Sequence, residues 1–432
     1  MPHAQTMGPP ADLLAALPAE RWFAGKARRI ADARVLDSVS DFWLVQIIYA
    51  DSGPTDTYLL TETLAGQAWL EHFRRKTVVD TARGGRVAFH ATSVLDTIDP
   101  DRARPAEPLR AEQSNTSIRF GDALVFKLFR RIQLGGENPE VEIGRFLTER
   151  TSFSDTPAVA GTLDYTASDG SLASFGLLQE FVPNRGDAWR GTLERLEAVL
   201  GGGAIEPAVQ PIGQLGEVTA RLHAALASDH ELARFAPEGI TESDVADWRA
   251  ALEAEVRQTA AALDQRPDLE PLLDRAAGIE ALCGSQKTRH HGDYHLGQVL
   301  ERPDGSFAII DFEGEPSRPL ATRTEKRSPL RDVAGLLRSL DYARHAALRA
   351  GPSDDERARR ATAWHDQARQ AFLDGYLTTL RPTAPDLLPN EPSGFNAALS
   401  ALELEKAAYE VRYELSHRPD WLPIPLAAFT CP

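Results

Sequence analysis

The sequence predicts an α+β protein in which a β-rich first half is followed by a mostly helical second half. Two runs of β-favouring residues, 42–50 and 57–64, are bounded by turn-forming stretches. In the second half, apolar residues recur at helical spacing over 214–226, and 400–417 continues the pattern. A buried-strand pattern at 175–184 ends in a polar, proline-marked exit between the halves. A joint between unlike lobes is a common position for a ligand cleft.

The elements of the first half follow from local patterns. A short helix is expected near 11–17, before the two strands, and the Pro- and charge-rich stretch 99–112 predicts a connector. Residues 114–132 predict two strands joined by a turn at Phe120–Asp122, and a helix should begin near Pro139. We therefore expect three parts: an N-terminal cap region (1–104), a β-rich lobe (105–185) and a mostly helical lobe (186–432).

Composition limits the class of protein. A chain of 432 residues with 42% hydrophobic and 25% charged residues is long and apolar enough for substantial cores. The net charge of −16 argues against a nucleic-acid partner, although a local basic pocket could still hold an anion. Cys283 and Cys431 form no disulfide framework or zinc site, and the apolar run 13–18 is too short to span a membrane. We expect a cytoplasmic protein without a membrane or nucleic-acid partner.

Chemistry-bearing residues cluster in "HGDYHLGQVL" (291–300) and "FAIIDFEGEP" (307–316). Asp293 and Asp311 flank a short predicted hairpin, so both carboxylates should emerge from the same end of it. Together with the amide of Gln298 they suit a hard cation such as Mg²⁺ that bridges phosphate oxygens. Gln298 and Asp311 are the expected metal ligands, and Asp293 is left to accept a proton from an attacking hydroxyl. Zinc held by the loop histidines is disfavoured, since no cysteine accompanies them.

Phosphoryl transfer also requires positive charge on the nucleotide, and Lys127 is the candidate. It lies in "LVFKLF", an apolar strand where a lysine needs a functional or structural reason. Glu142, on the following helix, is its expected carboxylate partner. The polar stretch before the strand predicts a turn that covers phosphates with hydroxyl and backbone N–H groups. Its residues are Ser114, Asn115, Thr116 and Ser117.

Taken together, these phrases and "SPLRDVAGLLRS" (328–339), "RWFAGK" (21–26) and "RPDWLPIPL" (418–426) resemble the bacterial maltokinase family. That family belongs to the aminoglycoside-phosphotransferase-like superfamily, whose fold is similar to that of protein kinases. The resemblance implies a bilobal, protein-kinase-like fold with an N-terminal cap. It also implies that Asp293 is the catalytic base, that Gln298 and Asp311 bind Mg²⁺, and that Lys127 pairs with Glu142. The adenine-facing hinge would comprise Gln179, Glu180 and Val182.

The helix 400–417 is the expected acceptor-binding element. Glu405, Tyr409 and Tyr413 share one helix face by their i, i+4, i+8 spacing, and Arg412 adjoins it. Acidic and tyrosine side chains suit sugar hydroxyls, and an acid can also hold an ammonium. Two further residues are assigned to the site, His295 near the phosphate and Trp421 against a sugar ring. A surface charge face over core tyrosines is the structural alternative.

The expected activity is that of an ATP- and Mg²⁺-dependent sugar kinase. Arg412 stands where we expect an apolar residue in maltokinases, which favours glucosamine, phosphorylated to glucosamine 6-phosphate, over maltose. Three alternatives stay open: a maltokinase that makes maltose 1-phosphate, an aminoglycoside phosphotransferase, and an inactive pseudokinase. The last would bind an enzyme of the trehalose or glycogen pathway.

Overall fold

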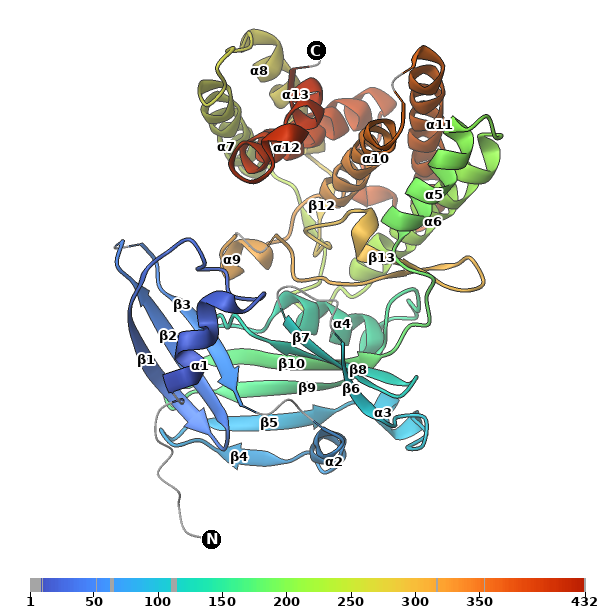
Figure 1. Cartoon of the computed structure of the whole chain (residues 1–432). Helices are drawn as coiled ribbons and strands as arrows, with labels where there is room; N and C mark the ends of the chain where they lie inside the picture. The colour runs from blue at the N-terminus through green and yellow to red at the C-terminus, as the bar shows by residue number, and fades with distance from the viewer. Residues whose placement is uncertain are drawn as a thin grey trace. The chain divides into compact units, whose positions relative to one another are not determined.

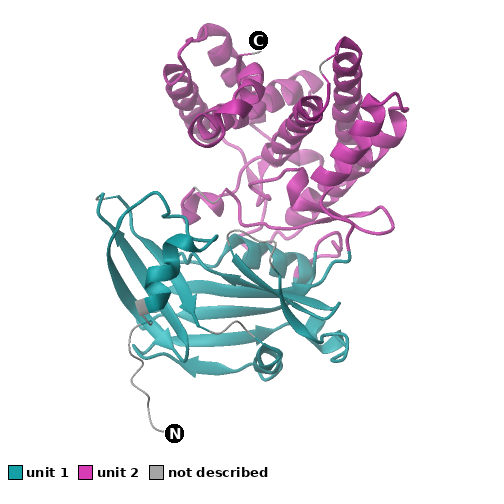
Figure 2. Cartoon of the chain, in the orientation of Figure 1, with its two compact units in different colours: residues 1–149, 157–183 teal, residues 150–156, 184–432 magenta. Residues whose placement is uncertain are grey.

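The computed structural model describes residues 9, 11–51, 53–62, 66–109, 115–315, 318–352 and 354–430, and every structural statement below concerns these residues. The chain forms two compact units, coloured teal and magenta in Figure 2. Unit 1 comprises residues 1–149 and 157–183, and unit 2 comprises 150–156 and 184–432. The boundary predicted after residue 185 lies near this division, whereas the one predicted after residue 104 falls inside unit 1.

Unit 1 begins with a small antiparallel sheet of β1 (Ile30–Val39), β2 (Phe42–Tyr49) and β3 (Asp56–Thr61). Helix α1 (Ala11–Ala16) and the 3-10 turn η1 (Leu17–Ala19) precede the sheet. The predicted short helix and the two predicted strands are thus confirmed. Phe23, which precedes β1, packs with its ring tilted against that of Tyr58, with ring centroids 5.2 Å apart, in a buried cluster on one face of the sheet.

The larger sheet of unit 1 is antiparallel, with strand order β4-β5-β9-β10-β8-β7-β6 (Figure 1). Its strands are β4 (Val78–Asp80), β5 (Arg86–Ala91), β6 (Ala106–Leu109), β7 (Asn115–Phe120), β8 (Leu124–Phe129), β9 (Val159–Thr166) and β10 (Leu172–Glu180). The helices of the unit are α2 (Ala68–Arg74), α3 (Ser93–Thr97) and α4 (Pro139–Arg150). The sheet joins strands from both sides of residue 104.

Two turns of this sheet test the sequence predictions. The predicted connector 99–112 is wrong at β6, which pairs with β7 in register Ala106↔Phe120. Pro108 of β6 is tolerated because β6 is an edge strand, where a missing N–H can face away from the ladder. The turn predicted at Phe120–Asp122 is confirmed: Gly121 has φ +56°, and a Cβ there would lie 1.8 Å from the Arg102 carbonyl oxygen. Only glycine fits this turn.

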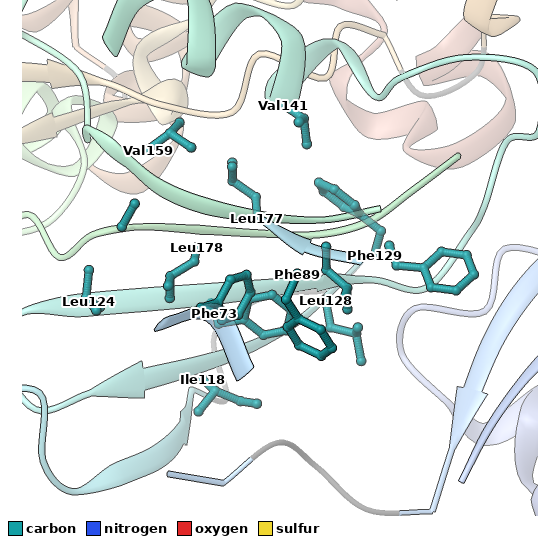
Figure 3. Close-up of a cluster of buried hydrophobic side chains, with 14 of the residues drawn as sticks. Phe73, Phe89, Ile118, Leu124, Leu128, Phe129, Val141, Val159, Leu177 and Leu178 are labelled. Carbon is teal, nitrogen blue, oxygen red and sulfur yellow. The ribbon is translucent and has the colours of Figure 1, made fainter. Parts of the chain in front are cut away.

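A continuous apolar core holds the larger sheet against its helices (Figure 3). Phe73 of α2 packs edge-on against Phe89 of β5, with ring centroids 5.1 Å apart, and Leu124 and Leu128 of β8 are fully buried. Val141 of α4 joins the same cluster. Close packing of this kind leaves β8 and the first turn of α4 little freedom relative to each other, which matters because both carry charged residues discussed below.

Unit 2 is mostly helical. Its helices are α5 (Ala188–Leu200), α6 (Glu206–Leu226), α7 (Glu242–Ala261), α8 (Glu270–Ala277), α9 (Leu320–Arg323), α10 (Leu330–Ala350), α11 (Asp355–Leu380), α12 (Pro392–His417) and α13 (Pro423–Thr430). Short pairs of strands are β11 (Glu238–Gly239) with β12 (Gln286–Lys287), and β13 (Val299–Glu301) with β14 (Phe307–Ile309). The predicted helices at 214–226 and 400–417 lie within α6 and α12. None of the helices in the described ranges is long and apolar enough to cross a membrane.

Helices α6 and α11 approach unusually closely (Figure 1). A Cβ on Gly216 would lie 2.2 Å from the Phe372 carbonyl oxygen, and one on Gly375 would lie 2.3 Å from the Gly213 carbonyl oxygen. Both glycines are therefore required for this backbone contact. The contact matters for the site described below, because it places His223 of α6 beside Tyr376 of α11, and His223 in turn binds Asp332.

Candidate functional site

The loop 291–298 in unit 2 is held by one buried carboxylate. Asp332, in the first turn of α10, accepts hydrogen bonds from the backbone N–H groups of His291 (2.7 Å) and Gly292 (3.0 Å). His223 donates to the same carboxylate through Nε2 at 3.1 Å, and its Nδ1 lies 2.9 Å from the Tyr376 hydroxyl. Burial opposes the charge of Asp332, but its histidine neighbours outweigh burial and hold its pKa below the usual range. The carboxylate therefore ties the loop to three helices.

A hairpin then brings the two ends of the motif together. Strands β13 and β14 pair in register Val299↔Ile309, and the N–H of Ile310 donates to the carbonyl of Gln298 at 3.0 Å. The side chain of Gln298 donates through Nε2 to Oδ2 of Asp311 at 2.9 Å. The prediction that the side chains of Gln298 and Asp311 lie next to each other is confirmed.

His291 holds the loop 291–298 against the same hairpin. The N–H of Asp293 donates to Nδ1 of His291 at 3.4 Å, so Nε2 carries the proton and donates to the Ile310 carbonyl oxygen at 2.9 Å. The ring is thus fixed in one tautomer between Asp293 and the residue before Asp311. No metal role is left for His291, because one ring nitrogen accepts and the other donates.

The oxygen atoms at the end of the hairpin suit a hard cation. Gln298 uses its NH₂ group toward Asp311, so its carbonyl oxygen and the carboxylate of Asp311 form an all-oxygen donor set. Such a set fits Mg²⁺, which prefers carboxylate and amide oxygens. Asp311 has φ +68°, a conformation that a residue with a side chain adopts at a cost of about 1–3 kcal/mol. Backbone strain of this kind concentrates where a side chain must be aimed.

Asp293 is paired with a lysine that sequence reasoning missed. Lys406 of α12 lies with Nζ 3.2 Å from Asp293 Oδ1 and 3.0 Å from Glu315 Oε1. Burial opposes the charge of Lys406, but the two carboxylates outweigh it and raise its pKa above the usual range. Glu315 is also bound by Arg318; although burial opposes its charge, Lys406 and Arg318 lower its pKa to about 2. Charges of alternating sign therefore follow one another from Asp293 of the loop through Lys406 of α12 and Glu315 to Arg318.

Asp293 and Lys406 border a cavity of about 590 Å³ within unit 2. Its other lining residues are Asp187, Trp189, His295, Gly297, Gly335, Ser339, Tyr342, Tyr409, Glu410, Tyr413, Glu414 and Arg418. On its α12 wall, Glu410 accepts from Arg338 at 2.8 Å, and Glu414 accepts from the Tyr342 hydroxyl at 3.0 Å. Asp293 thus opens onto a chamber large enough for a small molecule.

The residues expected to bind the acceptor divide into two groups. His295, Tyr409 and Tyr413 line the cavity. The other three do not: Glu405 pairs with Arg331 at 3.0 Å, Arg412 with Glu255, and Trp421 stacks on Tyr342 at 6.2 Å.

The helical periodicity of α12 explains the division. The row of α12 that faces the cavity is 406, 409, 410, 413 and 414, which contains two residues of the predicted stripe but has 406 in place of 405. Residues 405 and 412 therefore point to a neighbouring side of the helix.

In unit 1, Lys127 forms an ion pair with Glu140, not with Glu142 as predicted. Its Nζ lies 2.8 Å from Glu140 Oε2, and both side chains are buried. Glu140 and Glu142 both lie in the first turn of α4, where the N–H of Glu140 donates to Asn138 Oδ1 at 2.8 Å. Two glutamates so close in sequence differ by half a helical turn in direction, which periodicity alone did not resolve. The expectation that Lys127 meets a carboxylate of this helix is otherwise confirmed.

The phosphate-covering turn predicted at 114–117 is wrong over 115–117, and Ser114 lies outside the described residues. Asn115, Thr116 and Ser117 belong to β7, which pairs with β8 from Asn115↔Phe129 to Phe120↔Leu124. Ser117 is fully buried, and Thr116 Oγ1 accepts a hydrogen bond from Arg130 Nε at 2.8 Å. Pairing with an apolar strand outweighed the polar composition of the stretch.

The predicted hinge residues lie at the end of β10. Gln179 and Glu180 pair with Val125 and Leu124 of β8, and Val182 is buried just after the strand. They are thus next to the strand that carries Lys127. Their contact with an adenine ring stays a prediction.

These features define a class of protein. An ATP-dependent phosphotransferase has three such parts: a strand lysine paired with a helix glutamate, a loop aspartate, and an amide–carboxylate pair that follows it in the chain. Residues 105–372 match the model of the phosphotransferase enzyme family, so the chain belongs to that family. It is an ATP-dependent phosphotransferase that acts on a hydroxyl group, with the predicted aminoglycoside-phosphotransferase-like fold.

Curated relatives are more specific. The chain is 30% identical over 332 residues to a glucosamine kinase of Streptacidiphilus jiangxiensis, covering 74% of this chain and 71% of the relative. It is 30% identical over 336 residues to a glucosamine kinase of Mycolicibacterium smegmatis, covering 76% and 79%. A solved glucosamine kinase bound to glucosamine, ADP and inorganic phosphate shares the fold, with a TM-score of 0.71, 23% identity and coverage of 98% of this chain and 97% of that one.

Proposed function

We propose that the chain is a glucosamine kinase, which transfers the γ-phosphoryl group of ATP to the 6-hydroxyl of glucosamine. The observation that carries the proposal is the 30% identity to two curated glucosamine kinases over 74% and 76% of the chain. The position of Asp293 on the wall of the cavity of about 590 Å³ supports it, because an acceptor hydroxyl must reach the base.

In this proposal Asp293 orients the acceptor hydroxyl and accepts its proton. Its position is set from two sides: the N–H of Asp293 bonds to His291, and its carboxylate bonds to Lys406. Since phosphoryl transfer needs positioning and charge stabilisation more than covalent chemistry, a fixed base is what the reaction requires.

The phosphate groups are assigned to two further sets of residues. Gln298 and Asp311 would hold Mg²⁺, which when bound neutralises charge on the phosphate oxygens. Lys127 would bind a phosphate oxygen of ATP, with its ammonium kept in place by Glu140 at 2.8 Å. ATP and a sugar are the proposed small-molecule partners. A cytoplasmic location and a protein partner from the trehalose or glycogen pathway stay predictions from the sequence.

The second candidate acceptor is maltose. Two observations favour it: the cavity of about 590 Å³ is roomy for one sugar ring, and the wall carboxylates Glu410 and Glu414 are already paired with Arg338 and Arg418. A neutral acceptor would need no free carboxylate. The identity to glucosamine kinases ranks glucosamine first.

A panel of acceptors tests the proposal. Glucosamine, glucose, maltose and kanamycin are incubated separately with ATP and Mg²⁺, and products are identified by ³¹P and ¹H NMR. We expect the highest kcat/KM for glucosamine, with phosphate on O6. A higher kcat/KM for maltose with phosphate on the anomeric oxygen would establish the second candidate, and inactivity on all four acceptors would reject both.

A further inference from the structure

Lys406 helps to position Asp293 in the proposed function, but its charge at the wall of the acceptor cavity has a further consequence. Its ammonium touches the assigned base at 3.2 Å and borders the cavity with a side chain that is 20% exposed. The Tyr409 ring lies 5.2 Å from Nζ and closes one side. A cation placed against the base must affect a substrate that is itself a cation.

We propose that Lys406 selects which hydroxyl of an amino sugar is phosphorylated, by excluding the substrate ammonium from the neighbourhood of Asp293. The inference rests on the proposed function and deepens it. It makes Lys406 a specificity-determining residue: the hydroxyls on either side of the amino group, O1 and O3, are rejected, whereas a hydroxyl across the ring, such as O6, is accepted.

The chemistry of the acceptor explains the selection. In glucosamine the amino group is on C2, so O1 and O3 are vicinal to it and O6 is not. If O1 or O3 reached Asp293, the ammonium would come beside Lys406. An ammonium offers only donors and no acceptor, so the two ammonium groups could not hydrogen-bond, whereas the 2-hydroxyl of glucose could accept from Lys406. Like charges about 5 Å apart in a partly buried site disfavour each other by on the order of 100-fold.

The transfer step increases this discrimination. The acceptor oxygen forms its bond to the γ-phosphorus while the bond from that phosphorus to the β–γ bridging oxygen breaks, and ADP leaves with the electron pair. The hydroxyl proton passes to Asp293. As Asp293 becomes neutral it no longer offsets the charge of Lys406, so a vicinal ammonium is disfavoured most in the transition state. The neighbouring cations Arg338 and Arg418 repel less, because their partners Glu410 and Glu414 of α12 stay paired with them throughout; Glu410 also faces Lys406.

Other charged groups facing Lys406 are consistent with a fixed cation. Glu315 binds it at 3.0 Å and is itself held by Arg318, so Glu315 stays paired when Lys406 is replaced. Replacement by methionine, which is similar in length and uncharged, should therefore preserve the fold. Lys406→Gln is a second uncharged variant, and Lys406→Arg is the matched control that keeps the charge.

The experiment measures where phosphate is attached to glucosamine by the wild type and the three variants, using ¹H–³¹P correlation NMR. We expect no detectable O1 or O3 product from the wild type or Lys406→Arg, and a share of O1 plus O3 product at least tenfold above the detection limit from Lys406→Met and Lys406→Gln. Turnover by both uncharged variants with the position unchanged would overturn the inference.

A binding measurement keeps the inference testable if the uncharged variants fold but do not turn over. The ratio of Kd for glucose to Kd for glucosamine should rise at least threefold in Lys406→Met, and an unchanged ratio would overturn the inference. O1 or O3 product from the wild type would overturn it while leaving the kinase intact. No phosphorylation of glucosamine by the wild type would remove the proposed function and this inference together.

Discussion

Replacing Asp332 by asparagine should loosen the catalytic loop without touching a substrate-binding group. The carboxylate accepts from His291 N–H at 2.7 Å, from Gly292 N–H at 3.0 Å and from His223 at 3.1 Å. Asparagine keeps one oxygen and turns an NH₂ group toward at least one of these donors. The side chain is 1% exposed, so water cannot replace the lost acceptor.

The size of the effect follows from those bonds. A hydrogen bond to a charged group contributes about 1.5–3 kcal/mol, and a buried donor left unpaired costs a similar amount. We expect Asp332→Asn to lower the free energy of unfolding by about 3 kcal/mol. Because Gly292 directly precedes Asp293, a shift of the loop by about 1 Å should lower kcat by on the order of 100-fold.

The assay is urea unfolding followed by circular dichroism, together with steady-state kinetics at saturating ATP. Asp354→Asn is the matched control: Asp354 caps the exposed start of α11 by accepting from Arg357 N–H at 2.8 Å. It should cost about 1 kcal/mol of stability or less and leave kcat unchanged. Wild-type stability and kcat in Asp332→Asn would refute the role of this carboxylate in holding the loop.

Three further predictions concern other parts of the chain. Lys127→Met should lower kcat/KM for ATP by at least about 100-fold, and Glu140→Gln should lower it more than Glu142→Gln; equal effects of the two glutamine variants would contradict the observed ion pair. The pKa of Glu315 is lowered to about 2, so its ionised carboxylate stabilises the fold above the unfolded pKa of about 4.3, and this contribution is lost as the pH falls toward 2. Lys406→Met removes part of this contribution, so acid unfolding monitored by fluorescence should shift to higher pH. Gly375→Ala should lower the free energy of unfolding by about 1–3 kcal/mol, because a Cβ at residue 375 would lie 2.3 Å from the Gly213 carbonyl oxygen. An unchanged melting temperature would disprove the close α6–α11 contact.

The site could be predicted best where covalent connection forces residues together. A hairpin between Gln298 and Asp311 leaves few arrangements, and the two side chains do meet at 2.9 Å. The loop histidines were harder to place, since their partners come from elsewhere in the chain. The bond from His291 to Ile310 depends on a fold that local spacing does not specify.

The remaining predictions were limited by uncertainty about the side of the helix on which each side chain lies. Successive helix residues differ in direction by about 100° and residues two apart by about 200°, so choosing residue 405 for 406, or Glu142 for Glu140, changes the partner altogether. Lys406 carried a usable signal: it lies among Ala401, Leu402, Leu404, Ala407 and Ala408, an apolar context like the one that singled out Lys127. That context indicated a paired lysine in α12, but its partners Asp293 and Glu315 lie far away in sequence.

The β-strand errors have a different cause. The stretch 115–117 is polar by composition, yet it forms β7 because its neighbour β8 supplies both hydrogen bonds and apolar packing. Strand pairing depends on a partner, and a polar segment such as β7, which lies between β8 and β6, does not reveal its partners locally. The same reason accounts for β6, in a stretch whose prolines suggested a connector.

The central claim is that Asp293 is the base of a glucosamine kinase, and the most direct test compares the initial rate of glucosamine phosphorylation by the wild type and Asp293→Asn. The account predicts one ADP formed per glucosamine 6-phosphate in the wild type, and a kcat at least about 100-fold lower in Asp293→Asn with an unchanged melting temperature. A folded Asp293→Asn variant that phosphorylates glucosamine at the wild-type rate would contradict it.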